Sequence, residues 1–448
     1  SPYFQERVFD VKDVFHRLLW ELRPRKSAEA GPEKLVLVAR EASVMELFAV
    51  ERDRIAGMVI EHGSPQSHAA ILARSLGVPM VSQIPGLTAR VRPGQWLLVD
   101  GSAGTVEINP PQEHCLALAV AESASPVPVT EPGEGLPRVE VNVNLLYEVD
   151  AAVRLGASGV GLYRSEFLFL ARRTLPTEEE QVGIYRKLLQ QMNGRPVSIR
   201  TFDLRPDKLM AYAQMNPTAA RPFDWRVVLD SPPLQQLFLS QVRAILRAGA
   251  PGEDGMRVGP VRLLIPLVTR TELLEFVLQT VTQVQSDLAH EGLPHATQAT
   301  LGIMIETAAA APLVEDWAEW VDYFALGTND LTASALGLDR DDPVASGLCD
   351  SLHPGLLRVI DGVVTAAHRY GRPVTVCGEM AANPEGCLAL VALGVDSLSV
   401  PVNQLNAVRQ RLSNLPSPQL RELRPALLQQ KTSKQVRELL HNWDGSGV

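Results

Sequence analysis

The stretch LGIMIETAAAAPLVEDWAEWVDYFALGTND, residues 301–330, decides the fold. Two apolar strand-like runs in it, LGIMIET and VDYFALGTND, flank a helical segment. Six further strand-like runs, each followed by a helical stretch, lie elsewhere after residue 137: VEVNVNL, GVGLYRSEF, PVSIRTFDL, VRLLIPLV, VTVCGEM and SLSVPV. Eight such units in roughly 290 residues predict an α/β fold with a (β/α)8 TIM barrel over 138–430. A doubly wound open sheet is the alternative, but no Gly-rich fingerprint follows the first strand.

Local signals support the helices between these strands. Thr177 with Glu180 forms the sequence of a capping box. The apolar face of 356–367 has Pro354 near its start and Gly371 after its end, the usual asymmetry of helix termini.

The part of the chain before the barrel has a different pattern. Residues 1–33 contain an amphipathic helix that Pro24 ends. Residues 34–110 carry short strands (KLVLVAR, GMVI, WLLVD, TVEI) around one helix near 67–76, which predicts a small α/β domain. Residues 111–137 are rich in Pro, Gly and Glu and are predicted to form a linker. Residues 431–448 are predicted to be a C-terminal tail.

Composition narrows the class of protein. A net charge of -9 argues against nucleic-acid binding, which normally needs a basic face. No apolar run approaches the roughly 18 residues that span a bilayer, and the N-terminus carries no apolar signal region. The four cysteines form neither a disulfide framework nor a CxxC pair. We therefore expect a reduced, cytoplasmic protein.

Polar residues follow the predicted barrel strands, where a barrel collects its chemistry. Each has a structural alternative: arginines at strand ends often form rim salt bridges, and acids often cap the next helix. Together they predict a site. These residues are Arg164, Arg200, Glu306, Asn329, Asp330 and Cys377.

The chemistry of this set suits phosphoryl transfer. Arginine guanidinium groups bind phosphate and carboxylate oxygens, and Lys208 adds a point charge. Glu306 and Asp330 offer the oxygen ligands that Mg²⁺ prefers. Cys377 is either a buried small hydrophobe or, if it faces the site, a group that moves a proton to or from carbon.

A histidine loop lies in the smaller domain. HGSPQSHAAILARSLGVPM, residues 62–80, places His68 in the first turn of a predicted helix, beside unpaired backbone N–H groups that favour a phosphoryl group. The alternative is a surface histidine near a helix start. His62 is the weaker candidate, and neither histidine has the partners of a metal site.

These motifs resemble the phosphoenolpyruvate-utilising enzymes, specifically Enzyme I of the bacterial phosphotransferase system. HGSPQSHAAILARSLGVP is similar to the phosphohistidine signature of the family. GVGLYRSEFLF, SIRTFDLRPDK, GIMIETAAA, FALGTNDLT, LGLDR and VCGEMAANP resemble the barrel motifs in the family's order. HGSPQSHAAI and DSLHPGLLR resemble the nitrogen-related branch, and the resemblance covers nearly the whole chain.

The resemblance implies a role for each matching residue. His68 would take the phosphoryl group from phosphoenolpyruvate, and Cys377 would protonate the enolate to give pyruvate. The remaining roles are phosphate binding by Arg164, Arg200 and Lys208, carboxylate binding by Asn329 and Arg340, and Mg²⁺ binding by Glu306 and Asp330. The resemblance also implies an HPr-like phosphocarrier partner, a homodimer formed through the barrel, and a histidine domain that swivels.

Some positions depart from the family pattern. Arg205 and Pro206 precede Lys208 where the family has glycines, and in NPTAARPFDWR either Arg221 or Arg226 matches a further phosphate-binding arginine. A phosphoenolpyruvate-sensing scaffold with weak or lost transfer is therefore the alternative function. Pyruvate phosphate dikinase and phosphoenolpyruvate synthase share both domains but need an ATP-binding domain, which does not precede residue 34. Residues 1–23 resemble the last helix of a carrier-docking domain, so we expect a fragment of a longer protein.

Overall fold

The computed structural model describes most of the barrel and part of the smaller domain. The described residues are 34–40, 54–62, 73, 78–101, 103–111, 114, 132–133, 135–170, 175–203, 225–252, 258–338, 348–415 and 420–443. The predicted helix at 1–23 lies outside them, as does most of the predicted linker at 111–137.

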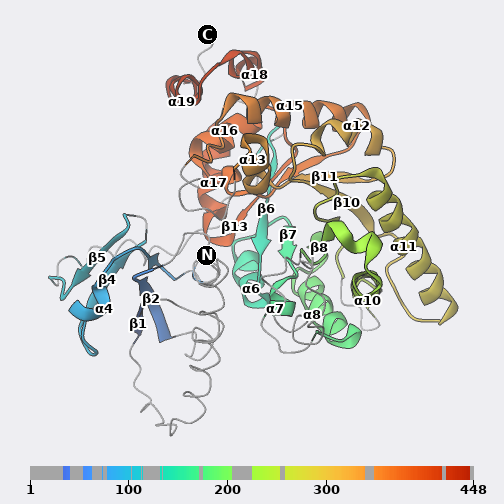
Figure 1. Cartoon of the computed structure of the whole chain (residues 1–448), viewed down its shortest axis with the longest axis horizontal. Helices are drawn as coiled ribbons and strands as arrows, with labels where there is room; N and C mark the ends of the chain where they lie inside the picture. Colours follow the sequence, from blue (N-terminus) through green and yellow to red (C-terminus); the bar gives the residue numbers. More distant parts are fainter. Residues whose placement is uncertain are drawn as a thin grey trace, which may run out of the picture.

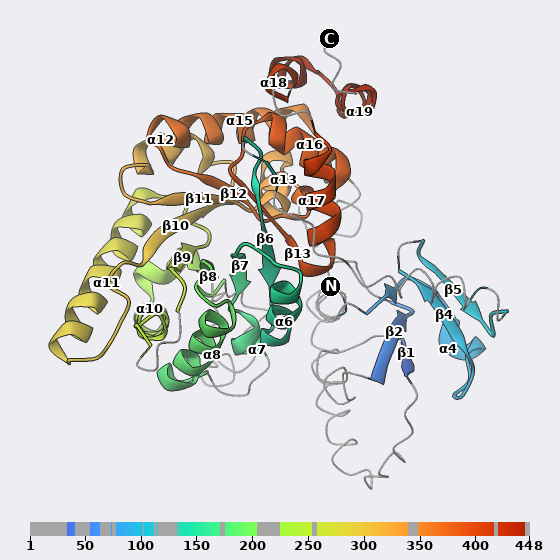
Figure 2. The same cartoon turned by 180° about the vertical axis from the view of Figure 1, so that it is seen from behind.

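Eight parallel strands form a closed barrel, which confirms the predicted fold class. Helices surround the strands, as Figures 1 and 2 show from opposite sides. The last strand pairs with the first, so the ring has no open edge. The strands are β6 Arg138–Val143, β7 Val160–Arg164, β8 Val197–Arg200, β9 Val261–Ile265, β10 Thr300–Ile305, β11 Tyr323–Leu326, β12 Val374–Val376 and β13 Ser397–Pro401.

Two barrel helices begin where the sequence predicts. Thr177 and Glu180 form the capping box that starts α8, and Pro354 is the first residue of α15.

No helix within the described residues is long and apolar enough to cross a membrane. The helices around the barrel are α6 Leu146–Arg154, α7 Phe167–Leu170, α8 Glu178–Gln191, α10 Pro232–Ala248, α11 Thr271–His290, α12 Val314–Trp317, α13 Thr328–Leu336, α15 Pro354–Arg369, α16 Pro384–Ala392, α17 Leu405–Ser413, α18 Leu420–Gln429 and α19 Ser433–Asn442, with 3₁₀ turns η3 Trp225–Asp230, η4 Ala311–Leu313, η5 Glu379–Ala381 and η6 Val402–Gln404.

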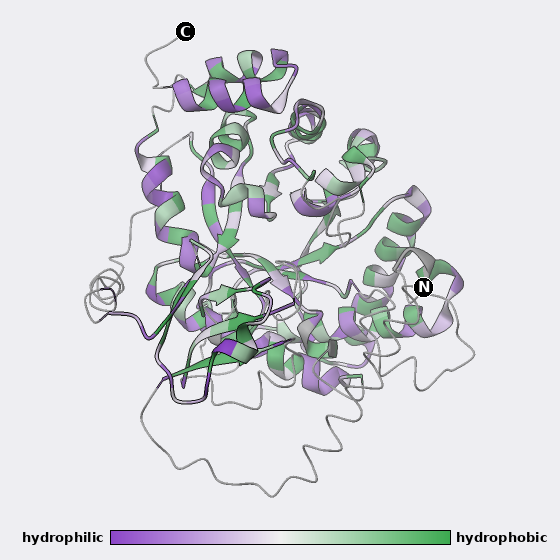
Figure 3. Ribbon diagram, turned by 60° about the vertical axis from the view of Figure 1, so that its left-hand side comes forward, coloured by the Kyte–Doolittle hydropathy of each residue, from purple (hydrophilic) through white to green (hydrophobic). Residues whose placement is uncertain are grey.

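The main core lies between the strands and the helices, and a smaller core fills the barrel. Figure 3 shows hydrophobic residues along the strands and alternating hydrophobic and hydrophilic residues on the surrounding helices. Inside the barrel, Tyr323 donates its hydroxyl hydrogen to the carbonyl of Leu263 at 3.2 Å. A Cβ at Gly302 would overlap the Tyr323 ring, so this position accepts only glycine without rearrangement. Glu140, buried, pairs with Arg262 at 2.9 Å in the same interior.

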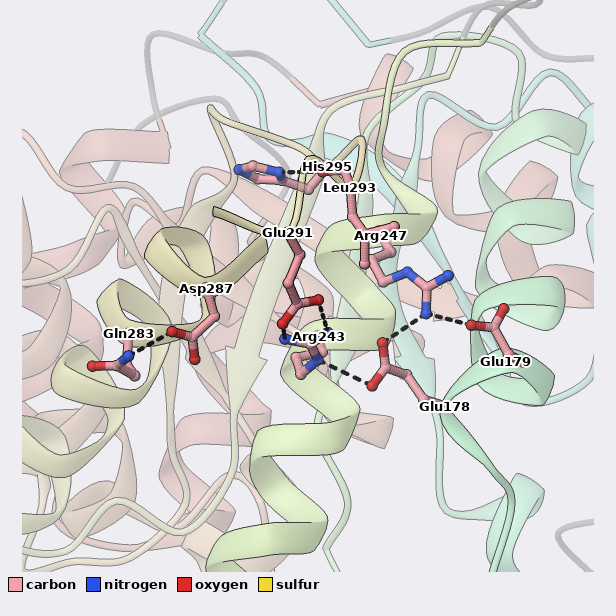
Figure 4. A network of polar contacts seen from close by, with 9 residues as sticks. All are labelled: Glu178, Glu179, Arg243, Arg247, Gln283, Asp287, Glu291, Leu293 and His295. Atoms are coloured by element: carbon pink, nitrogen blue, oxygen red, sulfur yellow. Dashed lines mark hydrogen bonds and ion pairs between the residues drawn. The ribbon is translucent and has the colours of Figure 1, made fainter. Parts of the chain in front are cut away.

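An ion-pair network ties three helices together on the outside of the barrel (Figure 4). Glu178 at the start of α8 accepts from Arg243 Nε at 3.1 Å and from Arg247 Nη1 at 2.7 Å, both on α10. Arg243 also binds Glu291, which follows α11, at 2.7 Å. Because the arginine side chains are mostly buried, this network is worth more than isolated surface pairs.

The predicted tail contains a helix that joins the barrel core. Val436 and Leu440 on α19 are buried in the main core cluster. Arg437 on the same helix makes two 2.9 Å bonds to the carboxylate of Asp350. Burial alone would raise the pKa of Asp350, but the hydrogen bonds from Arg437, from the Leu352 backbone and from Ser433 lower it to about 2.

The smaller domain contains two short sheets. β1 Leu35–Ala39, β2 Ile55–Ile60 and β3 Met80–Val81 are parallel, and β4 Leu97–Asp100 pairs antiparallel with β5 Thr105–Ile108. A short helix, α4 Leu87–Arg90, follows β3. The four predicted strand runs each overlap an observed strand. Of the predicted helix near 67–76, only Ala73 is described, and its side chain is buried.

Candidate functional site

The carboxyl ends of the barrel strands carry the described candidate residues. Arg164 and Arg200 end β7 and β8, Glu306 directly follows β10, and Cys377 directly follows β12. The first turn of α13, after β11, contains Asn329 and Asp330. Because all eight strands are parallel, these ends share one rim of the barrel. His68, Lys208, Arg340 and Arg221 lie outside the described residues, as does the side chain of Arg226.

The electrostatics of Cys377 indicate that these groups lie near one another. Burial raises the pKa of the Cys377 thiol to about 12. Arg200 and Arg164 act to lower this pKa, whereas Glu306 and Asp330 raise it further. Charge interactions fall with distance, so the four charged groups that act on this thiol lie near it. The thiol therefore stays protonated near neutral pH, inside a cluster of charges.

Glu306 forms the acidic side of the cluster. Its side chain is almost fully buried, and its Oε1 accepts a hydrogen bond from the Leu267 backbone at 2.6 Å. Burial raises the pKa of Glu306 to about 8, with further contributions from the Asp203 and Asp330 carboxylates and an opposing one from Arg200. A divalent cation would relieve this repulsion between carboxylates. Glu306 and Asp330 thus fit the role of magnesium ligands.

The protein alone would supply few ligands to such a cation. Within the described ranges, no three His, Cys, Asp or Glu side chains gather closely enough to hold a metal ion. Mg²⁺ commonly binds one or two carboxylates and completes its shell with water and substrate phosphate. The acidic pair therefore suits a metal that arrives with a phosphorylated substrate.

Two acids that sequence reasoning missed hold Arg200. Glu166 forms an ion pair with Arg200 Nη2, and Asp203 Oδ2 lies 3.9 Å from the same nitrogen. Both acids are buried, and within the described residues Arg200 Nε, Glu166 Oε2 and Asp203 Oδ1 have no hydrogen-bond partner. Buried polar atoms of this kind are satisfied by a ligand or water. Their positions, two and three residues after strand-end arginines, are the signal that could have found them.

The loop that carries Cys377 is fixed on its β11 side. Cys377 donates its backbone N–H to the carbonyl of Leu326 at 3.1 Å, and its thiol donates to the same oxygen at 3.4 Å. A Cβ on Gly378 would overlap the Thr328 hydroxyl, so only glycine fits. Glu379 donates its backbone N–H to Asn329 Oδ1 at 2.9 Å. Since that N–H can only donate, the amide nitrogen of Asn329 is the group presented elsewhere.

Two family models cover most of the chain. Residues 126–416 match the model described as "PEP-utilising enzyme, PEP-binding domain", where PEP is phosphoenolpyruvate, and residues 31–104 match "PEP-utilising enzyme, mobile domain". The second match contains His68, and the first contains every other candidate residue.

Whole-chain relatives carry related names. A multiphosphoryl transfer protein of Xanthomonas campestris pv. campestris is 34% identical over 461 residues, which cover 98% of this chain and 53% of the relative. Phosphoenolpyruvate-protein phosphotransferase of Geobacillus stearothermophilus is 31% identical over 97% of this chain and 76% of the relative. The enzyme of that name from Haemophilus influenzae is 30% identical over 99% and 78%. The chain thus spans about half of the first relative and about three quarters of the other two.

Proposed function

The chain belongs to the PEP-utilising enzymes, and from that membership we propose that it transfers the phosphoryl group of phosphoenolpyruvate to His68, releases pyruvate, and passes the phosphate to an HPr-like carrier protein. One observation carries the proposal most strongly. Two arginines, two carboxylates and a buried thiol lie at strand ends on one rim of the barrel, and all four charged groups act on the pKa of the thiol. Charge neutralisation and positioning are what phosphoryl transfer requires.

The described residues can hold the two anionic ends of phosphoenolpyruvate. Arg164 and Arg200 end neighbouring strands and both act to lower the pKa of the Cys377 thiol, so they are proposed as donors for the phosphate, with Lys208 as a further proposed contact. Asn329 has its amide oxygen committed to Glu379 and can donate from its nitrogen to the substrate carboxylate, beside a proposed contact from Arg340. Mg²⁺ at Glu306 and Asp330 would neutralise charge on the transferring phosphate.

The proposed reaction balances in two steps. A ring nitrogen of neutral His68 forms a bond to phosphorus while the bond from phosphorus to the enol oxygen breaks, which leaves the enolate of pyruvate. The S–H bond of Cys377 then breaks as a C–H bond forms at the methylene carbon, and water returns a proton to the thiolate. Burial supports this order, because it keeps the thiol protonated before the enolate forms.

Labelling tests the proposal directly. The protein is incubated with Mg²⁺ and phosphoenolpyruvate carrying ³²P, and the phosphate is mapped by peptide mass spectrometry. We expect an acid-labile label on His68 that His68→Ala abolishes. His62→Ala, six residues away on an exposed side chain, is the matched control and keeps the label. Equal label on His68→Ala and wild type would refute the proposal. Saturable binding without label would favour the phosphoenolpyruvate-sensing scaffold.

The finer assignments are also proposals. Within the family we propose the nitrogen-related branch, on the resemblance of HGSPQSHAAI and DSLHPGLLR. We also propose a cytoplasmic location, on composition, and a homodimer through the barrel, on the family resemblance. Sedimentation at several concentrations tests the dimer, and transfer from labelled protein to purified carriers of each branch tests the branch.

A further inference from the structure

Asn142 on β6 bonds across the barrel to the residue after β12. Its Nδ2 donates to the carbonyl of Cys377 at 3.1 Å. The strand between them, β13, contributes Ser399, which is fully buried and donates its hydroxyl hydrogen to Asn142 Oδ1 at 2.7 Å. In such barrels, inward side chains from alternate strands share a layer, and β6 and β12 are alternate strands. This geometry explains how a short amide reaches Cys377.

The orientation of the Asn142 amide is determined by its partners. The Cys377 carbonyl can only accept, so the NH₂ group must face it. The hydroxyl of Ser399 then donates to the remaining amide oxygen. Both ends of the amide are satisfied inside a mostly buried space, and a flipped amide would place two oxygens against each other. A buried polar group that loses its partner costs about 1–3 kcal/mol, so the arrangement holds firmly.

Two hydrogen bonds, from opposite sides, hold the backbone of Cys377. Leu326 fixes the backbone N–H of Cys377 from β11, and Asn142 fixes its carbonyl from β6. With both peptide groups held, the remaining freedom of the thiol is rotation about its own Cα–Cβ bond, away from the Leu326 carbonyl to which it donates at 3.4 Å. We propose that Asn142, oriented by Ser399, is a positioning residue that aims the Cys377 thiol at one face of the bound enolate. The proposal rests on the proposed function and adds a residue to it.

Transfer of the proton from the Cys377 thiol to the methylene carbon of the enolate depends on where the thiol points. Reacting atoms must approach to about 3–3.5 Å, and displacements of about 1 Å can cost a hundredfold in rate. A Cys377 loop freed on one side would miss the methylene carbon in part of its conformations. The enolate would then leave, or take a proton from water on either face. Phosphoryl transfer to His68 precedes this step and would continue.

The handedness of the methyl group of pyruvate shows whether the Cys377 thiol protonates one face of the enolate. Phosphoenolpyruvate with one methylene hydrogen replaced by deuterium is turned over in tritiated water, and the handedness of the resulting methyl group of pyruvate is measured. We expect a single hand from the wild type and a loss of at least half of that excess from Asn142→Leu, with the phosphohistidine burst within threefold of wild type. Ser399→Ala, which keeps the amide but removes one of the two hydrogen bonds that orient it, should lose part of the excess.

The control variant removes a side-chain hydrogen bond to a β6 carbonyl that does not involve Asn142 or Cys377. Ser158 donates its hydroxyl hydrogen to the carbonyl of Val139, at the start of β6, at 2.7 Å. Ser158→Ala should leave both the handedness and the burst unchanged. A merely structural role for Asn142 would instead lower the burst and the handedness together, in step with thermal stability, and would overturn the inference.

A second readout is independent of the reaction. Disulfide reagents should modify Cys377 at least tenfold faster in Asn142→Leu than in the wild type, while Cys349, which is partly exposed, is unchanged. Should Asn142→Leu fail to fold, Ser399→Ala carries the same comparison. An unchanged rate at Cys377 together with unchanged handedness would overturn the inference. Absence of phosphohistidine in the wild type would overturn the proposed function alone, because the modification rates still test the anchor.

Discussion

The thiol of Cys377 should be far less reactive in the folded protein than in the unfolded chain. Burial raises its pKa to about 12 from an ordinary value of 9.0. The thiolate is the nucleophile, so at pH 8 its population falls by about 10³. A thiolate of higher pKa is intrinsically more nucleophilic, and this offsets the loss by about twentyfold in thiol–disulfide exchange. The remaining effect is about fiftyfold, before any steric protection of a side chain that is 3% exposed.

The measurement compares native and unfolded protein. Protein is treated with 4,4′-dithiodipyridine in buffer and in 8 M urea, and each cysteine peptide is quantified over time. We expect Cys377 to react at least fiftyfold slower in buffer, and the ratio to stay constant below about pH 8, because both thiolate populations rise tenfold per pH unit well below their pKa values. Cys387, whose buried thiol also has a raised pKa of about 11, should be slow as well. A native rate for Cys377 within fivefold of the unfolded rate would refute a buried, protonated thiol.

Three stability changes follow from contacts described above. Glu178→Gln should lower the free energy of unfolding in urea by about 1 kcal/mol, because it weakens a network of two mostly buried arginines across three helices, whereas Glu438→Gln in an exposed pair should change it by less than about 0.5 kcal/mol. Equal effects of the two would contradict a special role for the network. Asp350 has a lowered pKa, so its contribution to the free energy of unfolding is complete above pH 4 and is lost as the pH falls from about 4 to about 2. With allowance for its partial exposure, Asp350→Asn should remove about 1 kcal/mol of that free energy at pH 7. The variant should also lose less stability than the wild type between pH 4 and pH 2. If this variant loses as much stability as the wild type between pH 4 and pH 2, the ion pair of Asp350 does not cause the acid sensitivity. Gly302→Ala should cost about 1–3 kcal/mol through overlap with the buried tyrosine ring, whereas Gly362→Ala on the exposed face of α15 should stabilise by about 0.5–1 kcal/mol. Thermal melts that rank the two glycine variants the other way would count against the packing described inside the barrel.

Much of the barrel could be read from apolar runs. Each of the eight predicted runs overlaps an observed strand, because strands buried on both faces are continuously apolar and differ clearly from amphipathic helices. The sequence does not predict strand β3, since two residues carry no detectable pattern. It places helix α19 in a C-terminal tail, because the partner of its short apolar face, on α16, is distant in sequence.

The sequence predicts the candidate site residues only where they lie at the ends of predicted strands. The rule that barrel chemistry follows the strands identified Arg164, Arg200, Glu306 and Cys377 without any knowledge of their contacts. Roles that arise from pairing across the barrel were not predictable in this way. Asn142 is one of two asparagines in an ordinary strand run, and only the closed ring brings it to a residue 235 positions away. The roles of all these site residues, and of His68, Lys208 and Arg340 as well, stay predictions.

Closure of the ring between β13 and β6 has a consequence for how the protein is made. Arg138 pairs with Ser397, so the contact that seals the barrel joins residues separated by roughly 260 positions along the chain. At a synthesis rate of about 5–20 residues per second, the ribosome needs about 13–50 seconds between these two residues. The nascent strands wait through that interval with unpaired edges, the condition under which aggregation competes with folding. Residues 31–104, which match the mobile-domain model, are synthesised before the first barrel strand begins at Arg138.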